Sequence, residues 1–169
     1  MRLGLYVICA FAAVWGVTAL SGLRAPAWVL AAPVLISIAV VWWVAPKVFA
    51  PSDRTPESGR RASRAVIVWS GLQAVGIVGA AVILPNLGLA RLFIPVMALC
   101  VALHFIGLAK DIPFRPYYVT GAVMTLTSLV ALSLPGGWGA VVAASAGALI
   151  LWATSLSFPF LPAARRPSA

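Results

Sequence analysis

The sequence predicts an all-α protein, built as a bundle of six transmembrane helices. The chain has 169 residues, of which 63% are hydrophobic and 9% are charged, whereas a soluble domain is about half apolar and a quarter charged. The apolar residues fall in long continuous runs, and the breaks between the runs hold Pro, Gly and most of the cations. Such runs predict helices, because a membrane barrel would alternate polar and apolar residues.

Six runs are long enough to cross the hydrocarbon layer. Each has about 18–20 residues, the length that a helix rising 1.5 Å per residue needs to span about 30 Å. We expect the first run to stay as an anchor, because it is longer than the apolar part of a signal peptide. Together they predict a membrane domain over residues 1–158. The runs are 3–20, 27–45, 65–84, 92–109, 117–134 and 138–156.

Three of the breaks are short and carry turn residues. They are SGLRAP at 21–26, PNLG at 85–88 and LPGG at 134–137. Pro and Gly end helices, and a short connection makes consecutive helices antiparallel neighbours. We therefore expect three helical hairpins, formed by the first and second, third and fourth, and fifth and sixth runs.

The polar stretch 46–64 fixes the predicted orientation. With six crossings, this loop, the loop 110–116 and both termini share one side of the membrane. That side carries ten of the twelve cations, and the other side carries only Arg24 and Arg91. The positive-inside rule then places both termini, including a flexible tail at 159–169, in the cytoplasm.

The basic cytoplasmic loop suggests one class of partner. Loop cations next to a membrane attract anionic lipid headgroups. Nucleic acid is not expected, because its binding needs a basic face on a folded domain. The lipid bilayer is the predicted partner.

His104 is the leading candidate for chemistry. It is the only histidine, and it lies about 9 Å inside the predicted cytoplasmic boundary of the fourth helix. Met97, Cys100 and His104 share one helix face, with Asp111 one heptad further on. Sulfur and imidazole are ligands for Cu(I) or Zn. A metal site would need further ligands from other helices, so none is predicted.

A structural hydrogen bond is the favoured role for His104. Thr120 on the next helix lies at about the same depth, with Tyr117 and Tyr118 close by. A hydroxyl there would satisfy the imidazole, which is costly to bury unpaired in hydrocarbon. The alternatives are a proton relay and a contact to a bound ligand.

Gln73 is the second polar candidate, near the middle of the third helix. It shares that helix with Gly71, Gly76 and Gly79. Small residues let helices approach closely, and a central amide can bond across the gap. Helix packing is the favoured role, and lining a polar pathway is the alternative.

The sixth helix carries a face of small residues. A surface of this kind allows close packing of helices. It could serve either the bundle or a homo-oligomer, and the sequence does not decide between them. The face comprises Ala140, Ala144, Gly147, Ala148 and Leu151.

Several function classes lack the residues they need. No Asp, Glu, Lys or Arg lies well inside a predicted span, which argues against ion-coupled transport through a membrane carboxylate and against a carboxylate enzyme. The motifs GxSxG, HExxH, Walker A and GxGxxG are missing. No cofactor and no catalytic residue is therefore predicted.

The segment LHFIGLAKDIPFRPYYVTG, Leu103–Gly121, joins the fourth and fifth predicted helices. It resembles a helical hairpin, LHFxxLA…PxYYVTG, of small uncharacterised bacterial multi-pass membrane proteins. The resemblance covers 19 of the 169 residues. It implies no activity, but it makes this hairpin the part to mutate first.

The sequence supports best a non-enzymatic integral membrane protein of unknown specific role. The first alternative is a small transporter or channel, which a shared cavity for Gln73, His104 and the hydroxyls of Thr125, Thr127 and Ser128 would favour. The second alternative is a membrane enzyme or redox subunit that acts on lipid or quinone. It would need His104 to open to the lipid–water boundary.

Overall fold

The structure is a computed structural model that describes residues 2–48, 56–112 and 114–160. These residues form six α-helices and no strand, which confirms the predicted all-α bundle. The α-helices are α1 (Arg2–Gly22), α2 (Ala32–Val44), α3 (Pro56–Asn86), α4 (Phe93–Asp111), α5 (Arg115–Ser133) and α6 (Trp138–Ser157), and the short 3-10 turns are η1 (Val29–Ala31), η2 (Ala45–Lys47), η3 (Ala90–Leu92) and η4 (Phe158–Phe160).

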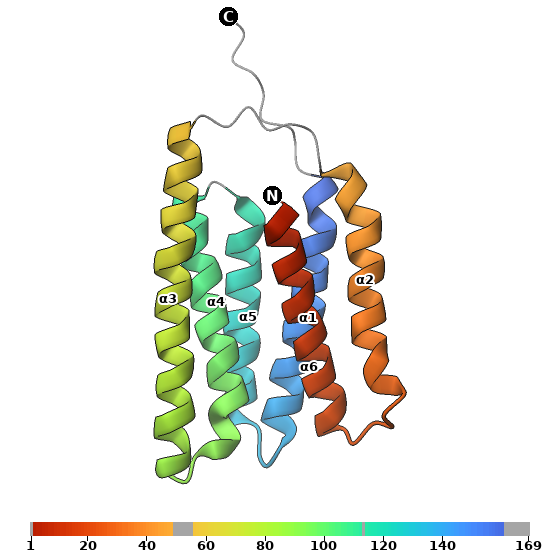
Figure 1. Ribbon diagram of the computed structural model, residues 1–169. Helices are drawn as coiled ribbons and strands as arrows, with labels where there is room; N and C mark the ends of the chain where they lie inside the picture. The colour runs from red at the N-terminus through yellow and green to blue at the C-terminus, as the bar shows by residue number, and fades with distance from the viewer. Residues whose placement is uncertain (1, 49–55, 113, 161–169) are drawn as a thin grey trace, which may run out of the picture.

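The helices run up and down in one bundle (Figure 1). Neighbours touch in the order α3, α4, α5, α6, α1 and α2, so the three predicted hairpins are present. α6 occupies the centre, where it also contacts α4 and α2. The start of α1 and the end of α6 lie at the same end of the bundle, together with the start of α3. α2 and α3 are consecutive in sequence but lie at opposite ends of this order.

Of the six described α-helices, five are long and apolar enough to cross a membrane, and α5 is the exception. α5 is less apolar because it carries several hydroxyl groups. Each of these hydroxyls donates to a carbonyl of α5 itself, so its hydrogen bond needs no water. α5 can therefore lie in hydrocarbon with the others. The hydroxyls belong to Thr120, Thr125, Thr127, Ser128 and Ser133.

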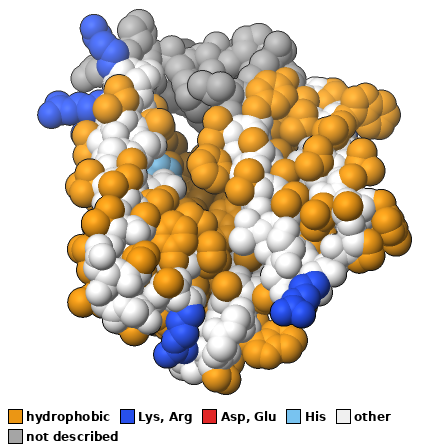
Figure 2. Space-filling view, turned by 60° about the horizontal axis from the view of Figure 1, so that its bottom comes forward, with side chains coloured by type: hydrophobic (Ala, Val, Ile, Leu, Met, Phe, Trp, Pro, Cys, Tyr) orange, Lys and Arg blue, Asp and Glu red, His pale blue; other side chains and the backbone are white. Residues whose placement is uncertain are grey.

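The surface between the two ends of the bundle is apolar. Figure 2 shows hydrophobic side chains over most of the visible face, with the visible Lys and Arg side chains at the two ends. A soluble protein would scatter charges over such a surface. The helices and this surface together identify a helical membrane protein.

α3 begins earlier than the sequence predicted. We expected a loop as far as residue 64, but the helix starts at Pro56, so the loop prediction is wrong for residues 56–64. Pro is well suited to a first helical position, and the residues that follow are mostly good helix formers. The 31 residues of α3 extend over about 46 Å, so the helix is longer than the hydrocarbon layer is thick, about 30 Å. The rest of the loop, 49–55, and most of the tail, 161–169, lie outside the described residues.

The α6 face that carries small residues packs inside the bundle. The Trp15 ring of α1 lies against Gly147, where an added Cβ would come within 3.1 Å of it. Ala144, Ala148 and Leu151 are buried in the same core. The question that the sequence left open is answered for this face, which serves the bundle.

Candidate functional site

α3 and α4 are joined by a seam in which one large side chain of each helix meets a glycine of the other. The Trp69 indole of α3 lies flat on Gly107, and a Cβ added there would overlap the ring. Further along, the Cys100 sulfur of α4 lies against Gly76, where an added Cβ would be 2.9 Å from Sγ. The two glycines let the helices approach closely.

Gln73 and His104 lie at the same level of this seam. Because the helices are antiparallel, the contacts Trp69–Gly107 and Cys100–Gly76 place both side chains midway between them. Both are half-buried. The imidazole interacts with the main chain of Trp69, but its Nδ1 atom is buried and has no hydrogen-bond partner among the described residues.

The predicted hydrogen bond between His104 and Thr120 is wrong. The Thr120 hydroxyl lies 2.6 Å from that of Thr154 on α6 and donates to the Pro116 carbonyl at 2.9 Å. Thr120 therefore faces α6, whereas His104 faces α3. The two side chains lie at a similar level along the bundle but point toward different neighbouring helices.

The two tyrosines occupy different environments. Tyr117 packs in an aromatic cluster, with ring centroids 5.4 Å from Phe105 and 4.5 Å from Phe114. Tyr118 is exposed. The ring contact of His104 is to Phe105, at 5.7 Å.

Cys100 and His104 are not joined by a third His, Cys, Asp or Glu side chain in the described part of the chain. Cys100 faces Gly76 in the seam. Across residues 2–48, 56–112 and 114–160, no three His, Cys, Asp or Glu side chains are grouped so that they could hold a metal ion. The other cysteine, Cys9, donates to the Ser155 hydroxyl at 3.5 Å and so joins α1 to α6.

Neither of the two pockets described below is lined by the α5 hydroxyls, Gln73 or His104. Thr125 donates to the carbonyl of Gly121 at 2.8 Å, and Thr127 and Ser128 likewise bond to carbonyls of α5. Each of these hydroxyls therefore already donates a hydrogen bond within α5.

A basic pocket lies at one end of the α3–α4 seam. Its volume is about 600 Å³, and three arginines on two neighbouring turns of α3 line it, together with Trp69 and Asp111. The Trp69 indole N–H donates to Asp111 Oδ2 at 3.0 Å. Asp111, which lies one heptad beyond His104 on α4, is therefore held by Trp69. The arginines are Arg60, Arg61 and Arg64, and with Ala65 and Val68 they complete what we call the arginine pocket.

The arginine pocket was missed in the sequence because residues 46–64 were assigned to a loop. Positions 61, 64, 65, 68 and 69 follow the spacing of one helix face. That signal was present, but it becomes meaningful only once the helix is known to begin at Pro56.

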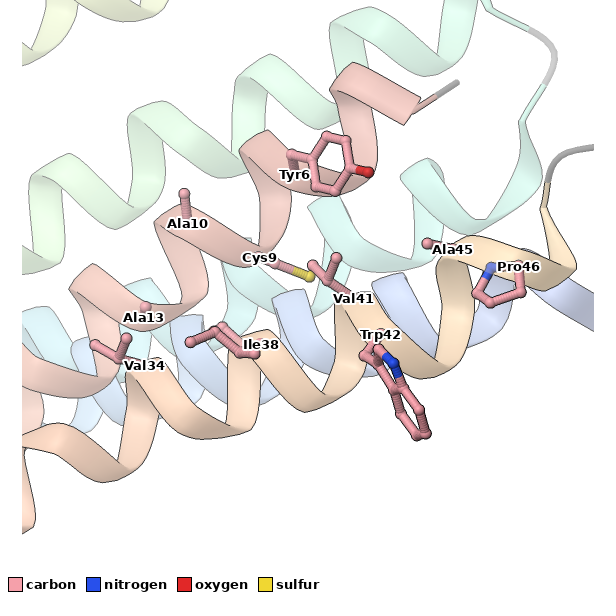
Figure 3. Close-up of a pocket in the computed structure, with 11 residues that line it drawn as sticks. Tyr6, Cys9, Ala10, Ala13, Val34, Ile38, Val41, Trp42, Ala45 and Pro46 are labelled. Atoms are coloured by element: carbon pink, nitrogen blue, oxygen red, sulfur yellow. The ribbon is translucent and has the colours of Figure 1, made fainter.

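A second pocket lies between α1 and α2 and is apolar. It also has a volume of about 600 Å³, and its walls are mostly Ala, Val and Ile. Figure 3 shows Cys9 pointing between the two helices, with Tyr6 and Trp42 nearer the end of the bundle. The pocket faces the region where lipid chains would lie, and it lacks charged side chains.

Comparisons with known proteins give no relative from which a role could be transferred. No protein-family model, no curated protein and no solved structure matches this chain. The chemistry of the arginine pocket is therefore inferred from its own residues.

Proposed function

We propose that this chain is a non-enzymatic integral membrane protein that holds the phosphate of a lipid headgroup in the arginine pocket. The observation that carries this proposal is the convergence of Arg60, Arg61 and Arg64 on one pocket. Guanidinium groups bind phosphate oxygens through paired, charge-assisted hydrogen bonds. Three of them in one pocket favour an anionic group more strongly than isolated surface cations do.

The position of the pocket favours a lipid over a soluble anion. Trp69 forms its inner wall, and tryptophan prefers the boundary between headgroups and hydrocarbon. Arg64 lies about 7.5 Å further out along α3, which is the headgroup layer. Beyond Trp69 the flanks of both helices are apolar and open, with Leu72 57% and Leu103 52% exposed. A lipid chain can continue along these flanks, whereas a free phosphate gains nothing from them.

The proposal includes the orientation of the bundle. Ten of the twelve cations belong to the side that carries the arginine pocket, so we place that side and both termini in the cytoplasm, in the cell membrane of a bacterium. The cytoplasmic leaflet is the more anionic one, and each nearby cation gains about 1 kcal/mol from it.

Lipid retention tests the proposal. The protein is incorporated into nanodiscs of phosphatidylcholine with a minority of phosphatidylglycerol, extracted, and analysed for bound lipid by native mass spectrometry. Replacing all three arginines by Gln should lower the retained phosphatidylglycerol by about tenfold or more, because even one well-formed hydrogen bond to a charged group is worth about 1.5–3 kcal/mol.

A matched control comes from the other end of the bundle. Arg24→Gln with Arg91→Gln removes cations that do not line the pocket and should leave lipid retention unchanged. Equal retention by the control and the triple variant would show that the arginine pocket holds no lipid phosphate.

A further inference from the structure

We propose that the arginine pocket selects an aminophospholipid, a lipid whose headgroup carries a primary ammonium as well as a phosphate. This inference rests on the proposed function, because the arginines must hold the phosphate. The additional observation is that a carboxylate, Asp111 of α4, lines the same pocket as the three arginines of α3. The pocket therefore presents both signs of charge.

The Asp111 carboxylate has bonding capacity left for a ligand. It accepts one hydrogen bond, from Trp69 Nε1 at 3.0 Å, and an ionised carboxylate can accept about four. None of the pocket arginines forms an ion pair with it in the described part of the chain. Within the described residues, each charge is thus open to a ligand.

The carboxylate is also held in place before a ligand arrives. Its partner Trp69 is pressed flat against Gly107 on the same helix that carries Asp111. A fixed acceptor loses little conformational freedom on binding, which favours affinity and specificity. Asp111 is in this way a positioned acceptor and not a freely moving surface charge.

The mixture of charges decides between headgroups. A phosphatidylglycerol headgroup can bind the arginines through its phosphate but offers Asp111 only hydroxyl groups and no positive charge. In an ethanolamine headgroup, two carbons separate the phosphate from an ammonium that has three N–H donors, so the arginines can bind one end and Asp111 the other. A choline headgroup carries a positive charge but no N–H donor. The pocket volume of about 600 Å³ is within the range of small-molecule sites.

The test is a competition among lipids in one membrane. Nanodiscs hold equal amounts of phosphatidylethanolamine, phosphatidylglycerol and phosphatidylcholine, and native mass spectrometry measures which lipid stays bound. The wild-type chain should retain phosphatidylethanolamine about tenfold over phosphatidylcholine, the value of one charge-assisted hydrogen bond. Asp111→Asn should abolish that preference, because the amide keeps an acceptor for Trp69 but loses the charge.

The controls separate this inference from the proposed function. Lys110→Gln changes an exposed neighbour that does not line the pocket and should leave the preference intact. If phosphatidylglycerol is retained best and Asp111→Asn changes nothing, the aminophospholipid is ruled out while the phosphate site stands. If the arginine triple variant retains all three lipids as wild type does, both proposals fail.

Soluble phosphoethanolamine distinguishes a lipid from a free ligand with the same chemistry. Added in excess over lipid, it should displace little phosphatidylethanolamine, because it cannot use the apolar flanks below Trp69. Displacement at concentrations equal to that of the lipid would overturn the assignment to a lipid.

Discussion

Gly107→Ala should separate α3 from α4 at their closest contact. A Cβ at this position would overlap the benzene part of the Trp69 indole, so the ring has to move away from α4. Trp69 then loses its hydrogen bond to Asp111. The arginine pocket loses its inner wall and its fixed carboxylate in the same step.

The expected destabilisation is about 2 kcal/mol. Overpacking costs about 1–3 kcal/mol, and losing the Trp69–Asp111 hydrogen bond adds about 0.5–1.5 kcal/mol. Replacing Gly by Ala within a helix returns about 1 kcal/mol. The overlap falls on the main interface of α3, because its main contacts among the described helices are to α4 and the adjoining η3 turn.

Equilibrium unfolding in mixed micelles of a mild detergent and SDS, followed by circular dichroism, measures the change. Gly79→Ala is the matched control, because no atom lies within 4 Å of a Cβ added there, and it should stabilise the protein slightly. In a Trp69→Ala background the Gly107→Ala change should cost nothing, because the overlap is gone. A Gly107→Ala protein as stable as wild type would refute the described seam.

Three further substitutions test the packing elsewhere. Thr120→Val should cost about 0.6–1.7 kcal/mol of unfolding free energy through the lost contact to Thr154, and a double-mutant cycle with Thr154→Val should show that the two effects are not additive. Gly139→Ala should cost about 3 kcal/mol in the same unfolding assay, because its Cβ would strike the Ala131 carbonyl oxygen, and a neutral result would contradict this close approach. His104→Leu should insert normally and lose no more than about 0.5–1.5 kcal/mol, the worth of one hydrogen bond, because the imidazole interacts with the main chain of Trp69 but its Nδ1 has no partner within the described structure; a loss above about 2 kcal/mol would mean that Nδ1 is bonded as well.

The arrangement of the helices could be predicted from the sequence because the bilayer imposes it. Long apolar runs and short Pro- or Gly-containing turns were enough for the three hairpins. The start of α3 could not be predicted in this way. Residues 56–64 include several charged side chains, and a prediction based on hydrophobicity ends the helix where the apolar run ends. The helix propensity of these residues extends α3 beyond the apolar run, back to Pro56.

The directions of the side chains were harder to predict than their depths. His104 and Thr120 were correctly placed at one depth, but the sequence could not tell that they face different neighbours. In a soluble helix the polar face marks the outside. Here lipid-facing and buried sides are both apolar, so that pattern is missing. Glycines gave a partial signal, since Gly76 does lie in the α3–α4 seam, whereas Gly71 and Gly79 are open.

The side of the membrane on which each end of α3 lies is the most direct test of the proposals made for the arginine pocket. In a background with Cys9→Ala and Cys100→Ala, Ser63→Cys and Leu87→Cys place single thiols at the two ends, and both positions are exposed. An impermeant maleimide should label position 63 only from the cytoplasm and position 87 only from outside. Labelling of both positions from one side would contradict a membrane-spanning α3, and the reverse pattern would place the arginine pocket at the outer leaflet.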